Sequence, residues 1–269
     1  MGSTTNPHGV GTTNSQATNA EMNKIVIQRP RPIEVIFFIP GVIILTMASV
    51  LVHFHPRPYA FDLQTTETIQ SVKLLPLITA FIEFVSALNN PIPSILALAI
   101  WLVGLVAIGF IYRARGRPSA IWFQSAIALI GTVAIAGGIN FIINILVARP
   151  RPGSFGEHII VLSHIPVNSF PSGHTEHDVA YYGFLLYLSF SQPVRQWRYR
   201  WVLIPLQVFA VLDILTIGYS RILEGEHWLT DVLAGYLSGA LWLLMCIVLY
   251  RGISSYLALR DQQRTTTLN

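Results

Sequence analysis

The sequence predicts an all-α integral membrane protein, built as a bundle of six transmembrane helices. Apolar residues make up 52% of the chain, only 11% of residues are charged, and the mean hydropathy is positive. A soluble domain has about 25% charged residues, so this chain is too apolar for that class. Six segments approach the roughly 20 apolar residues that span a hydrocarbon core. They are residues 33–52, 94–112, 120–147, 175–191, 201–219 and 231–250.

The membrane domain is expected to cover residues 33–250, with a polar segment on either side. Residues 1–32 are mostly small and polar, which is typical of disorder, and residues 251–269 form a cytoplasmic tail. The leader lacks a short apolar core with a cleavage-type ending, so residues 33–52 are predicted to be a retained span rather than a signal peptide. Residues 61–88 mix polar and apolar side chains, which favours an amphipathic helical region at the membrane interface.

Basic residues gather on one side of a six-span arrangement. The groups that precede span one and follow spans two, four and six share that side, which the positive-inside rule assigns to the cytoplasm. Both termini are then cytoplasmic, in an inner or plasma membrane. The groups are Lys24, Arg29 and Arg31; Arg113, Arg115 and Arg117; Arg195, Arg198 and Arg200; and Arg251, Arg260 and Arg264. Because they occupy short loops rather than one stripe, no nucleic-acid partner is expected.

Three short stretches converge on the opposite, outer face in this topology. "NILVARPRP" (144–152) lies at the outward end of span three, and "PSGH" (171–174) lies where span four begins. "SRILEGEHWLTD" (220–231) joins span five to span six and crowds ionisable groups next to a hydrophobic segment. The arrangement predicts one polar site built from parts that are distant in sequence.

The residue types in these stretches suit phosphate. Arg151 and Arg221 keep their charge and present forked donors that match phosphate oxygens, so together they can clamp an anion. Ser172 and Gly173 open a predicted helix, where backbone N–H groups can approach an anion and the helix dipole favours negative charge. We therefore expect a phosphate-binding site.

Histidines supply the remaining chemistry for hydrolysis. His227 and Asp231 are four residues apart, so they share one helical face if span six begins here. Asp231 can then accept a hydrogen bond from one imidazole nitrogen, which leaves the other free to attack phosphorus. His174, from another span, can protonate the leaving oxygen, since histidine serves as acid or nucleophile near neutral pH.

With these three stretches, the sequence resembles the type-2 phosphatidic acid phosphatase superfamily of integral membrane lipid phosphatases. Sequences of that family share a pattern of three parts. The first part is a lysine followed by six residues and Arg-Pro, and the second is Pro-Ser-Gly-His. The third part is Ser-Arg, five residues, His, three residues and Asp. The second and third parts match in full, and the likeness covers about residues 60 to 245. A six-span organisation is also typical of the family.

The resemblance implies a role for each matching position. His227 resembles the nucleophile that forms a phosphohistidine, Asp231 the residue that orients it, and His174 the general acid. The phosphate cradle corresponds to Arg151, Ser172, Gly173 and Arg221. The reaction would be metal-independent hydrolysis at the non-cytoplasmic face, with no cofactor.

One position departs from the family pattern. Asn144 stands where the family has lysine, so it can donate a hydrogen bond to phosphate but brings no charge. Arg149 could supply part of the missing charge. We therefore expect a weaker or differently shaped phosphate site.

The substrate is expected to be a lipid whose headgroup reaches the site while its tail stays in the membrane. Phosphatidic acid, phosphatidylglycerol phosphate, lysophosphatidate, sphingoid phosphates and polyprenyl pyrophosphate all fit this description, and the sequence does not choose among them. Two alternatives stay open: a lipid phosphotransferase on the same scaffold, and a non-catalytic membrane binding or transport relative.

Overall fold

The computed structural model describes residues 30–162 and 168–267, and all regular elements in this part of the chain are helices. The predicted disorder of residues 1–32 falls almost entirely outside the described residues. The α-helices are α2 (Pro32–Phe54), α3 (Ala60–Ser71), α4 (Pro76–Leu88), α5 (Pro91–Ala114), α6 (Ala120–Val147), α7 (Gly173–Phe190), α8 (Ile204–Leu223) and α9 (Leu229–Thr267). Two short 3-10 helices, η1 (Val194–Gln196) and η2 (Arg200–Leu203), connect α7 to α8. The all-α prediction is confirmed.

Local sequence explains where several helices begin and end. Helices α2, α4 and α5 begin at Pro32, Pro76 and Pro91, where the missing N–H of proline is not needed and its fixed φ suits the first turn. Helix α6 ends as Ala148 adopts a left-handed conformation (φ 53°), two residues before Pro150. The "ARPRP" sequence thus stops α6 and leads the chain across the end of the bundle.

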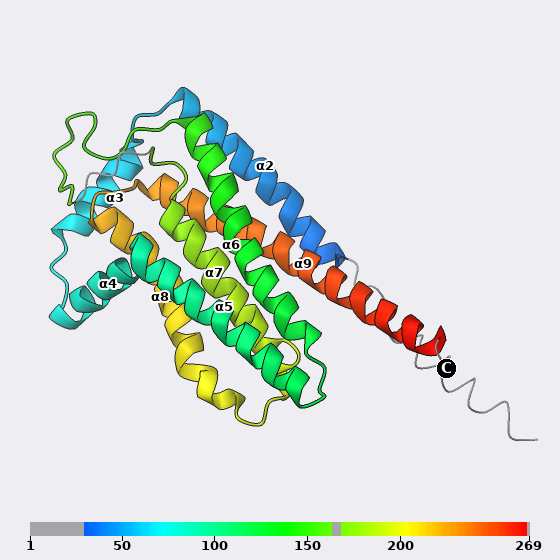
Figure 1. The fold of residues 1–269 in the computed structure, drawn as a ribbon. Helices are drawn as coiled ribbons and strands as arrows, with labels where there is room; N and C mark the ends of the chain where they lie inside the picture. Colours follow the sequence, from blue (N-terminus) through cyan, green and yellow to red (C-terminus); the bar gives the residue numbers. More distant parts are fainter. Residues whose placement is uncertain (1–29, 163–167, 268–269) are drawn as a thin grey trace, which may run out of the picture. The chain divides into compact units, whose positions relative to one another are not determined.

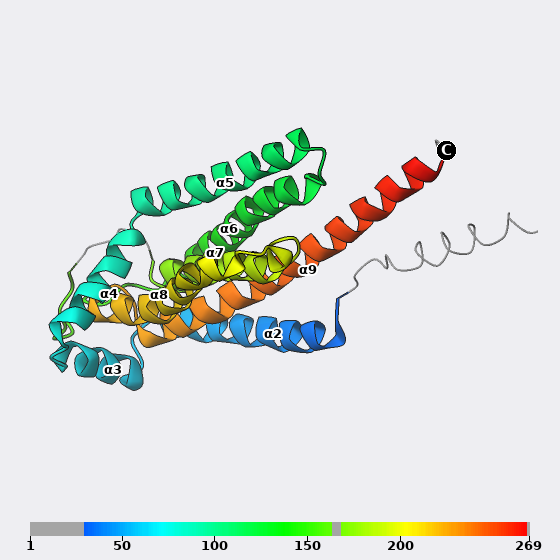
Figure 2. The same cartoon turned by 90° about the horizontal axis from the view of Figure 1, so that it is seen from below.

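Residues Arg31–Ile247 form one compact unit, whereas α9 from Val248 onward belongs to a separate unit. Within the compact unit, α7 packs against α6 and α8, while α6 also packs against α5 and α2. Figures 1 and 2 show α7 inside the bundle, with α3 and α4 near the end at which α7 begins. The start of α7 is therefore surrounded by protein.

Five helical segments are long and apolar enough to cross a membrane, among the residues that the structure describes. They are Pro32–Phe54, Pro91–Ala114, Ala120–Val147, Arg200–Leu223 and Leu229–Arg260. The predicted span four, 175–191, corresponds to helix α7, and its first turns carry polar and acidic residues including Glu176 and Asp178, both almost fully buried. The chain is a multi-pass membrane protein, and α7 differs from these five segments because buried polar side chains occupy its first turns.

Glycines of α9 allow it to approach the start of α7 closely. A Cβ at Gly235 would lie 2.7 Å from the Ser172 carbonyl oxygen, and one at Gly239 would lie 2.8 Å from the Glu176 carbonyl oxygen. Small residues four apart commonly bring membrane helices into backbone contact. This contact fixes the position of α7 along α9, and it therefore also fixes the position of the N-terminal residues of α7.

We expect Gly235→Ala to destabilise the protein and to reduce its activity. The added methyl group would meet a backbone oxygen, which cannot move without displacing the first turn of α7, and overpacking of this kind costs about 1–3 kcal/mol. Thermal unfolding in detergent measures the effect. Gly131→Ala is the matched control, because a Cβ there meets nothing within 4 Å. Equal stability of the two variants would contradict the role of Gly235.

Candidate active site

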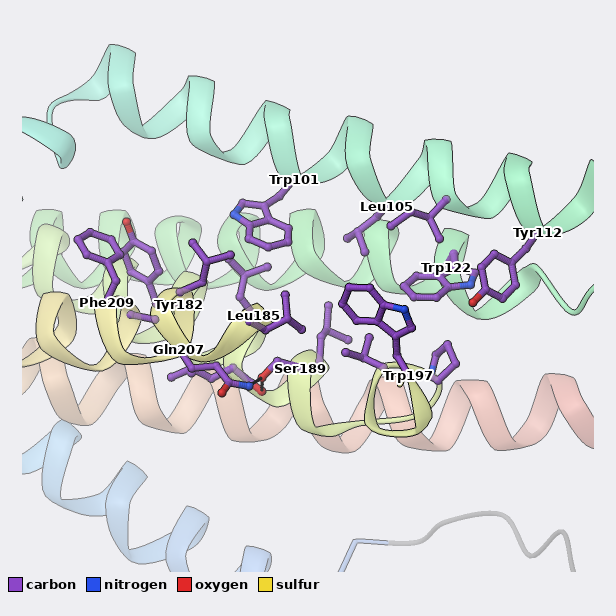
Figure 3. A pocket seen from close by; sticks show the side chains of 18 residues that line it. Trp101, Leu105, Tyr112, Trp122, Tyr182, Leu185, Ser189, Trp197, Gln207 and Phe209 are labelled. Atoms are coloured by element: carbon purple, nitrogen blue, oxygen red, sulfur yellow. Dashed lines mark hydrogen bonds between the residues drawn. The ribbon is translucent and has the colours of Figure 1, made fainter. Parts of the chain in front are cut away.

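One large cavity in the bundle has no charged side chains in its lining. It has a volume of about 350 Å³ and lies between α5, α6, α7 and α8, lined by residues that include Trp101, Trp122, Tyr182 and Trp197 (Figure 3). No histidine, arginine, lysine or acidic residue is among its lining side chains. Two polar residues of the lining bond to each other, because Gln207 donates a hydrogen bond to Ser189 Oγ over 2.9 Å. This cavity therefore offers no charged group that could bind phosphate.

The second cavity, of about 630 Å³, collects the residues predicted to be functional. The end of α6, the start of α7 and the turn before α9 meet there, although the three stretches are far apart in sequence. The predicted residues that line it are Asn144, Arg151, Gly173, His174 and His227. Ser172, Arg221 and Asp231 are buried next to it and are not part of its lining.

His227 lies in the turn between α8 and α9 and is only 1% exposed. Gly225 shapes this turn with a φ of 69°, and a Cβ there would lie 2.2 Å from the Ile160 carbonyl oxygen. The glycine is therefore required both by the left-handed backbone and by the close approach of residue 160.

Hydrogen bonding fixes which nitrogen of His227 carries the proton. Nδ1 lies 2.7 Å from the Ser169 carbonyl oxygen, and Nε2 lies 3.4 Å from Arg151 Nη1. A carbonyl only accepts and a guanidinium only donates, so Nδ1 is protonated and Nε2 presents its lone pair. Burial also lowers the pKa of His227, which favours the neutral ring. The imidazole is therefore prepared as a nucleophile at Nε2.

Asp231 contributes to this site less directly than the sequence suggested. Its Oδ2 lies 3.8 Å from His227 Nδ1, which is beyond hydrogen-bond distance, and accepts instead from the Trp228 backbone N–H over 2.9 Å. Its Oδ1 accepts from Arg149 Nη1 over 2.5 Å. The hydrogen bond to the Ser169 carbonyl therefore holds the His227 ring in its orientation, and Asp231 is a nearby negative charge.

Arg149 is fully buried in a network that ties α3 to α9. It pairs with Asp62 over 2.8 Å as well as with Asp231, and it donates a further hydrogen bond to Thr230 Oγ1 over 2.6 Å. Asp62 also accepts from the Thr230 backbone N–H over 2.9 Å. The expectation that Arg149 supplies part of the missing lysine charge is wrong for this structure, because two carboxylates neutralise its guanidinium away from the cavity.

The start of α7 presents Gly173 and His174 to the cavity. Ser172 is the N-cap residue; its N–H donates to the Asp231 carbonyl oxygen over 2.9 Å, and its Oγ accepts from Thr175 over 3.0 Å. These contacts tie the N-terminus of α7 to the first turn of α9. The N–H groups of the following residues are oriented towards the cavity end of the helix, where the dipole favours an anion.

Arg221 is held by carboxylates rather than presented to the cavity. Its Nη1 donates to Glu226 Oε2 over 2.7 Å and its Nη2 donates to Glu224 Oε1 over 3.1 Å. Arg151 faces the cavity, and its Nη1 also donates to the Glu226 carbonyl oxygen over 2.7 Å. The predicted pair of arginines is thus asymmetric in this state, with one cation at the cavity and the other engaged behind it.

One cluster has the spacing of a metal site among the described residues. Side-chain donor atoms of His174, Glu226 and His227 all lie within 4.8 Å of one another. The same groups stand next to Arg151 and Arg221, whose positive charges oppose a bound cation and favour an anion. The surroundings therefore fit phosphate better than a metal ion.

Asn144 lines the cavity, but its amide already has partners. Nδ2 donates to the carbonyl oxygens of Asn168 over 2.8 Å and Phe170 over 3.3 Å. Asn168 returns a hydrogen bond to the Asn144 carbonyl oxygen over 2.9 Å. In this state Asn144 stabilises the segment that carries Ser169, the partner of His227.

Sequence reasoning missed three contributors to the site. The Ser169 contact comes from a backbone carbonyl, which no side-chain motif can signal. Asp62 is one of two acids in a mixed helix, and only its burial against Arg149 reveals its role. Glu226 lies inside the third stretch, but the sequence does not distinguish a solvated loop charge from a buried partner of Arg221.

Comparisons with known proteins agree with this fold and with the three stretches. The sequence model of the PAP2 superfamily matches residues 125–254, a range that contains all three. A solved PAP2-type phosphatidylglycerolphosphate phosphatase from Bacillus subtilis is similar at a TM-score of 0.59 and 18% identity, covering 78% of this chain and 93% of that one. Aquifex aeolicus LpxE is similar at a TM-score of 0.46 and 21% identity, covering 70% of this chain and 96% of that one.

No curated protein matches the chain in sequence. At 18% identity, the likeness to the Bacillus subtilis structure bears on the fold, and the match to the superfamily model bears on the residues that line the cavity. The superfamily match agrees with the family resemblance of the three motif stretches. Residues 125–254 of the chain are therefore similar to the PAP2 superfamily in sequence.

Proposed function

We propose that this protein hydrolyses the phosphate ester of a membrane lipid through a phosphohistidine at His227. The observation that carries the proposal is the orientation of this ring: Nδ1–H is held by the Ser169 carbonyl, and Nε2 is directed to Arg151 in a cavity that His174 also lines. A nucleophile, an acid and a cation are the three groups that phosphoryl transfer without a metal needs.

The reaction proceeds in two steps. In the first, the Nε2 lone pair attacks phosphorus, an N–P bond forms, the P–O bond to the lipid breaks, and His174 protonates the leaving oxygen. In the second, water attacks the phosphohistidine and gives its proton to His174, which releases inorganic phosphate and restores both rings. Arg151 and the N–H groups at the start of α7 stabilise negative charge on the phosphoryl oxygens in both steps.

The cavity walls fit a lipid substrate. On the α5 and α6 side the lining includes Ile95, Phe141 and Ile145, which are 66%, 64% and 55% exposed. Apolar side chains exposed on spanning helices face lipid, so a tail can remain in the bilayer while the phosphate reaches His227. We further propose that α7 is a sixth span, that α3 and α4 lie at the interface, and that the site faces away from the cytoplasm, where both termini lie.

A release assay tests the proposed function. Purified protein is given a panel of lipid phosphates, including phosphatidic acid and a polyprenyl pyrophosphate, with a chelator and with or without an acceptor alcohol. We expect inorganic phosphate to appear in the presence of the chelator and no phosphorylated acceptor to form. A labelled acceptor without free phosphate would instead show a phosphotransferase, and no product from any lipid would favour a binding or transport protein.

A further inference from the structure

The apolar cavity of about 350 Å³ lies towards the end of the bundle opposite the candidate active site. Its lining on α7 runs from Tyr182 to Ser189, whereas His174 of the other cavity stands at the start of the same helix. Ligand pockets commonly have about 300–1,000 Å³ and a lining of apolar and aromatic side chains. Leu206 of the lining is 50% exposed, so the lining extends to the apolar surface of a spanning helix.

One buried polar group of this lining has no hydrogen-bond partner in the part of the chain that the structure describes. It is Nε1 of Trp122, in the first turn of α6, and the residue is only 8% exposed. An indole N–H can only donate, and a buried donor without an acceptor costs free energy. Figure 3 shows Trp122 beside Tyr112 at one end of the cavity, with Tyr182 and Phe209 towards the other. A ligand with an acceptor next to an apolar chain therefore suits this cavity.

Positive charge gathers on two connections, residues 113–119 and 191–203, that adjoin the cavity. Figures 1 and 2 place both connections at the end of the bundle opposite α3 and α4. The first directly follows the lining residue Tyr112, and the second contains the lining residues Val194 and Trp197. Neither connection contains an acidic residue, so an anionic headgroup is favoured here. Together they carry six exposed arginines: Arg113, Arg115, Arg117, Arg195, Arg198 and Arg200.

We propose that this cavity is a binding site for one anionic phospholipid that is not the substrate. One acyl chain occupies the apolar cavity, an ester carbonyl accepts from Trp122 Nε1–H, and the phosphodiester headgroup lies against the arginines of the two connections. Trp and Tyr side chains are enriched at the headgroup level of bilayers, which agrees with the positions of Tyr112 and Trp197 at this end. The site is separate from the candidate active site and does not depend on the proposed function.

The test compares the binding of two lipids that differ in headgroup charge. Delipidated protein in a neutral detergent is titrated with dioleoyl phosphatidylglycerol or dioleoyl phosphatidylcholine, and native mass spectrometry counts the bound lipids. Both lipids have the same chains and ester groups, and neither has the phosphate monoester that the proposed reaction needs. We expect one phosphatidylglycerol to bind at least about tenfold more tightly than phosphatidylcholine, because each basic residue near an anionic lipid contributes about fivefold.

Three variants test the parts of the site separately. Ala210→Phe places a ring in the cavity that Ala210 lines and should abolish the tight binding of phosphatidylglycerol. Trp122→Phe keeps an aromatic ring but removes the donor, so the affinity should fall about fivefold, the size of one neutral hydrogen bond. Arg195→Gln combined with Arg198→Gln should lower the affinity for phosphatidylglycerol about thirtyfold and leave that for phosphatidylcholine unchanged.

Three control variants match these changes elsewhere in the chain. Ala107→Phe adds the same ring at an exposed position of α5 outside the lining, and Arg57→Gln combined with Lys73→Gln removes two exposed charges from the connections that flank α3. Arg151→Gln removes the cation that faces the candidate active site. All three should bind phosphatidylglycerol as the unmodified protein does.

Equal affinity of the two lipids for the unmodified protein would overturn the proposal. So would tight binding of phosphatidylglycerol by Ala210→Phe. A loss in Arg151→Gln as large as that in the Arg195 and Arg198 double variant would also overturn it, because the lipid would then occupy the candidate active site. If Ala210→Phe does not fold, Trp122→Phe and the double variant decide, and unchanged affinity in both refutes the site.

Discussion

His227→Ala is expected to abolish phosphate release from every lipid phosphate that the protein hydrolyses. Removing a covalent nucleophile leaves only substrate binding and charge stabilisation, so the loss in kcat should be at least about four orders of magnitude. The phosphohistidine should disappear as well. Brief incubation with a labelled substrate, followed by denaturation in alkali, would trap the N–P bond in the unmodified protein and leave the variant unlabelled.

Two further histidine variants make this result specific. His177 lines the same cavity, with Nε2 3.0 Å from Ser94 Oγ, so His177→Ala controls for the loss of an imidazole there and should retain most activity. His174→Ala should lose about 10²–10⁴-fold, because it removes proton donation to the leaving oxygen. Its defect should be much smaller with 4-nitrophenyl phosphate, whose leaving group needs no proton. Normal labelling of His227→Ala would refute the assigned nucleophile.

Sequence patterns predicted the helical elements well where a long apolar run was bounded by polar or helix-stopping residues. The predicted span 120–147 coincides with α6, which begins after Ser119 and ends before the left-handed Ala148. The agreement between predicted spans and observed helices was weaker for the helix that begins at the candidate site. Helix α7 forms where span four was expected, yet its polar first turns, which hold two histidines and two acids, leave it too polar to count as a span by composition.

Only the residues of the candidate site that belong to sequence motifs could be predicted. The predicted topology brought the three stretches together, because it places each of them next to a predicted span on the same side of the membrane. The contacts that decide the state of each group are long-range: Ser169 is 58 residues from His227, and Asp62 is 168 residues from Thr230. Such contacts depend on tertiary packing, which the local pattern around each residue does not contain.

Arg149→Ala is expected to destabilise the fold more than any surface substitution. Asp62 and Asp231 are both fully buried, and the variant would leave them without their shared cation. Removing one partner of a buried ion pair costs about 3–5 kcal/mol, because the remaining charge stays in a medium of low dielectric constant. Unfolding in mixed detergent micelles, followed by circular dichroism, measures this loss, with the exposed Arg117→Ala as control.

A second variant shows whether charge is the cause. Asp62→Asn combined with Arg149→Ala removes one of the two unpaired carboxylates, so the double variant should be more stable than Arg149→Ala alone, as coupled neighbours are not additive. A phosphate-binding role for Arg149 makes the opposite prediction: Arg149→Ala would weaken phosphate binding and leave stability near that of Arg117→Ala. Because its guanidinium is fully buried against two carboxylates, we expect the loss of stability to dominate.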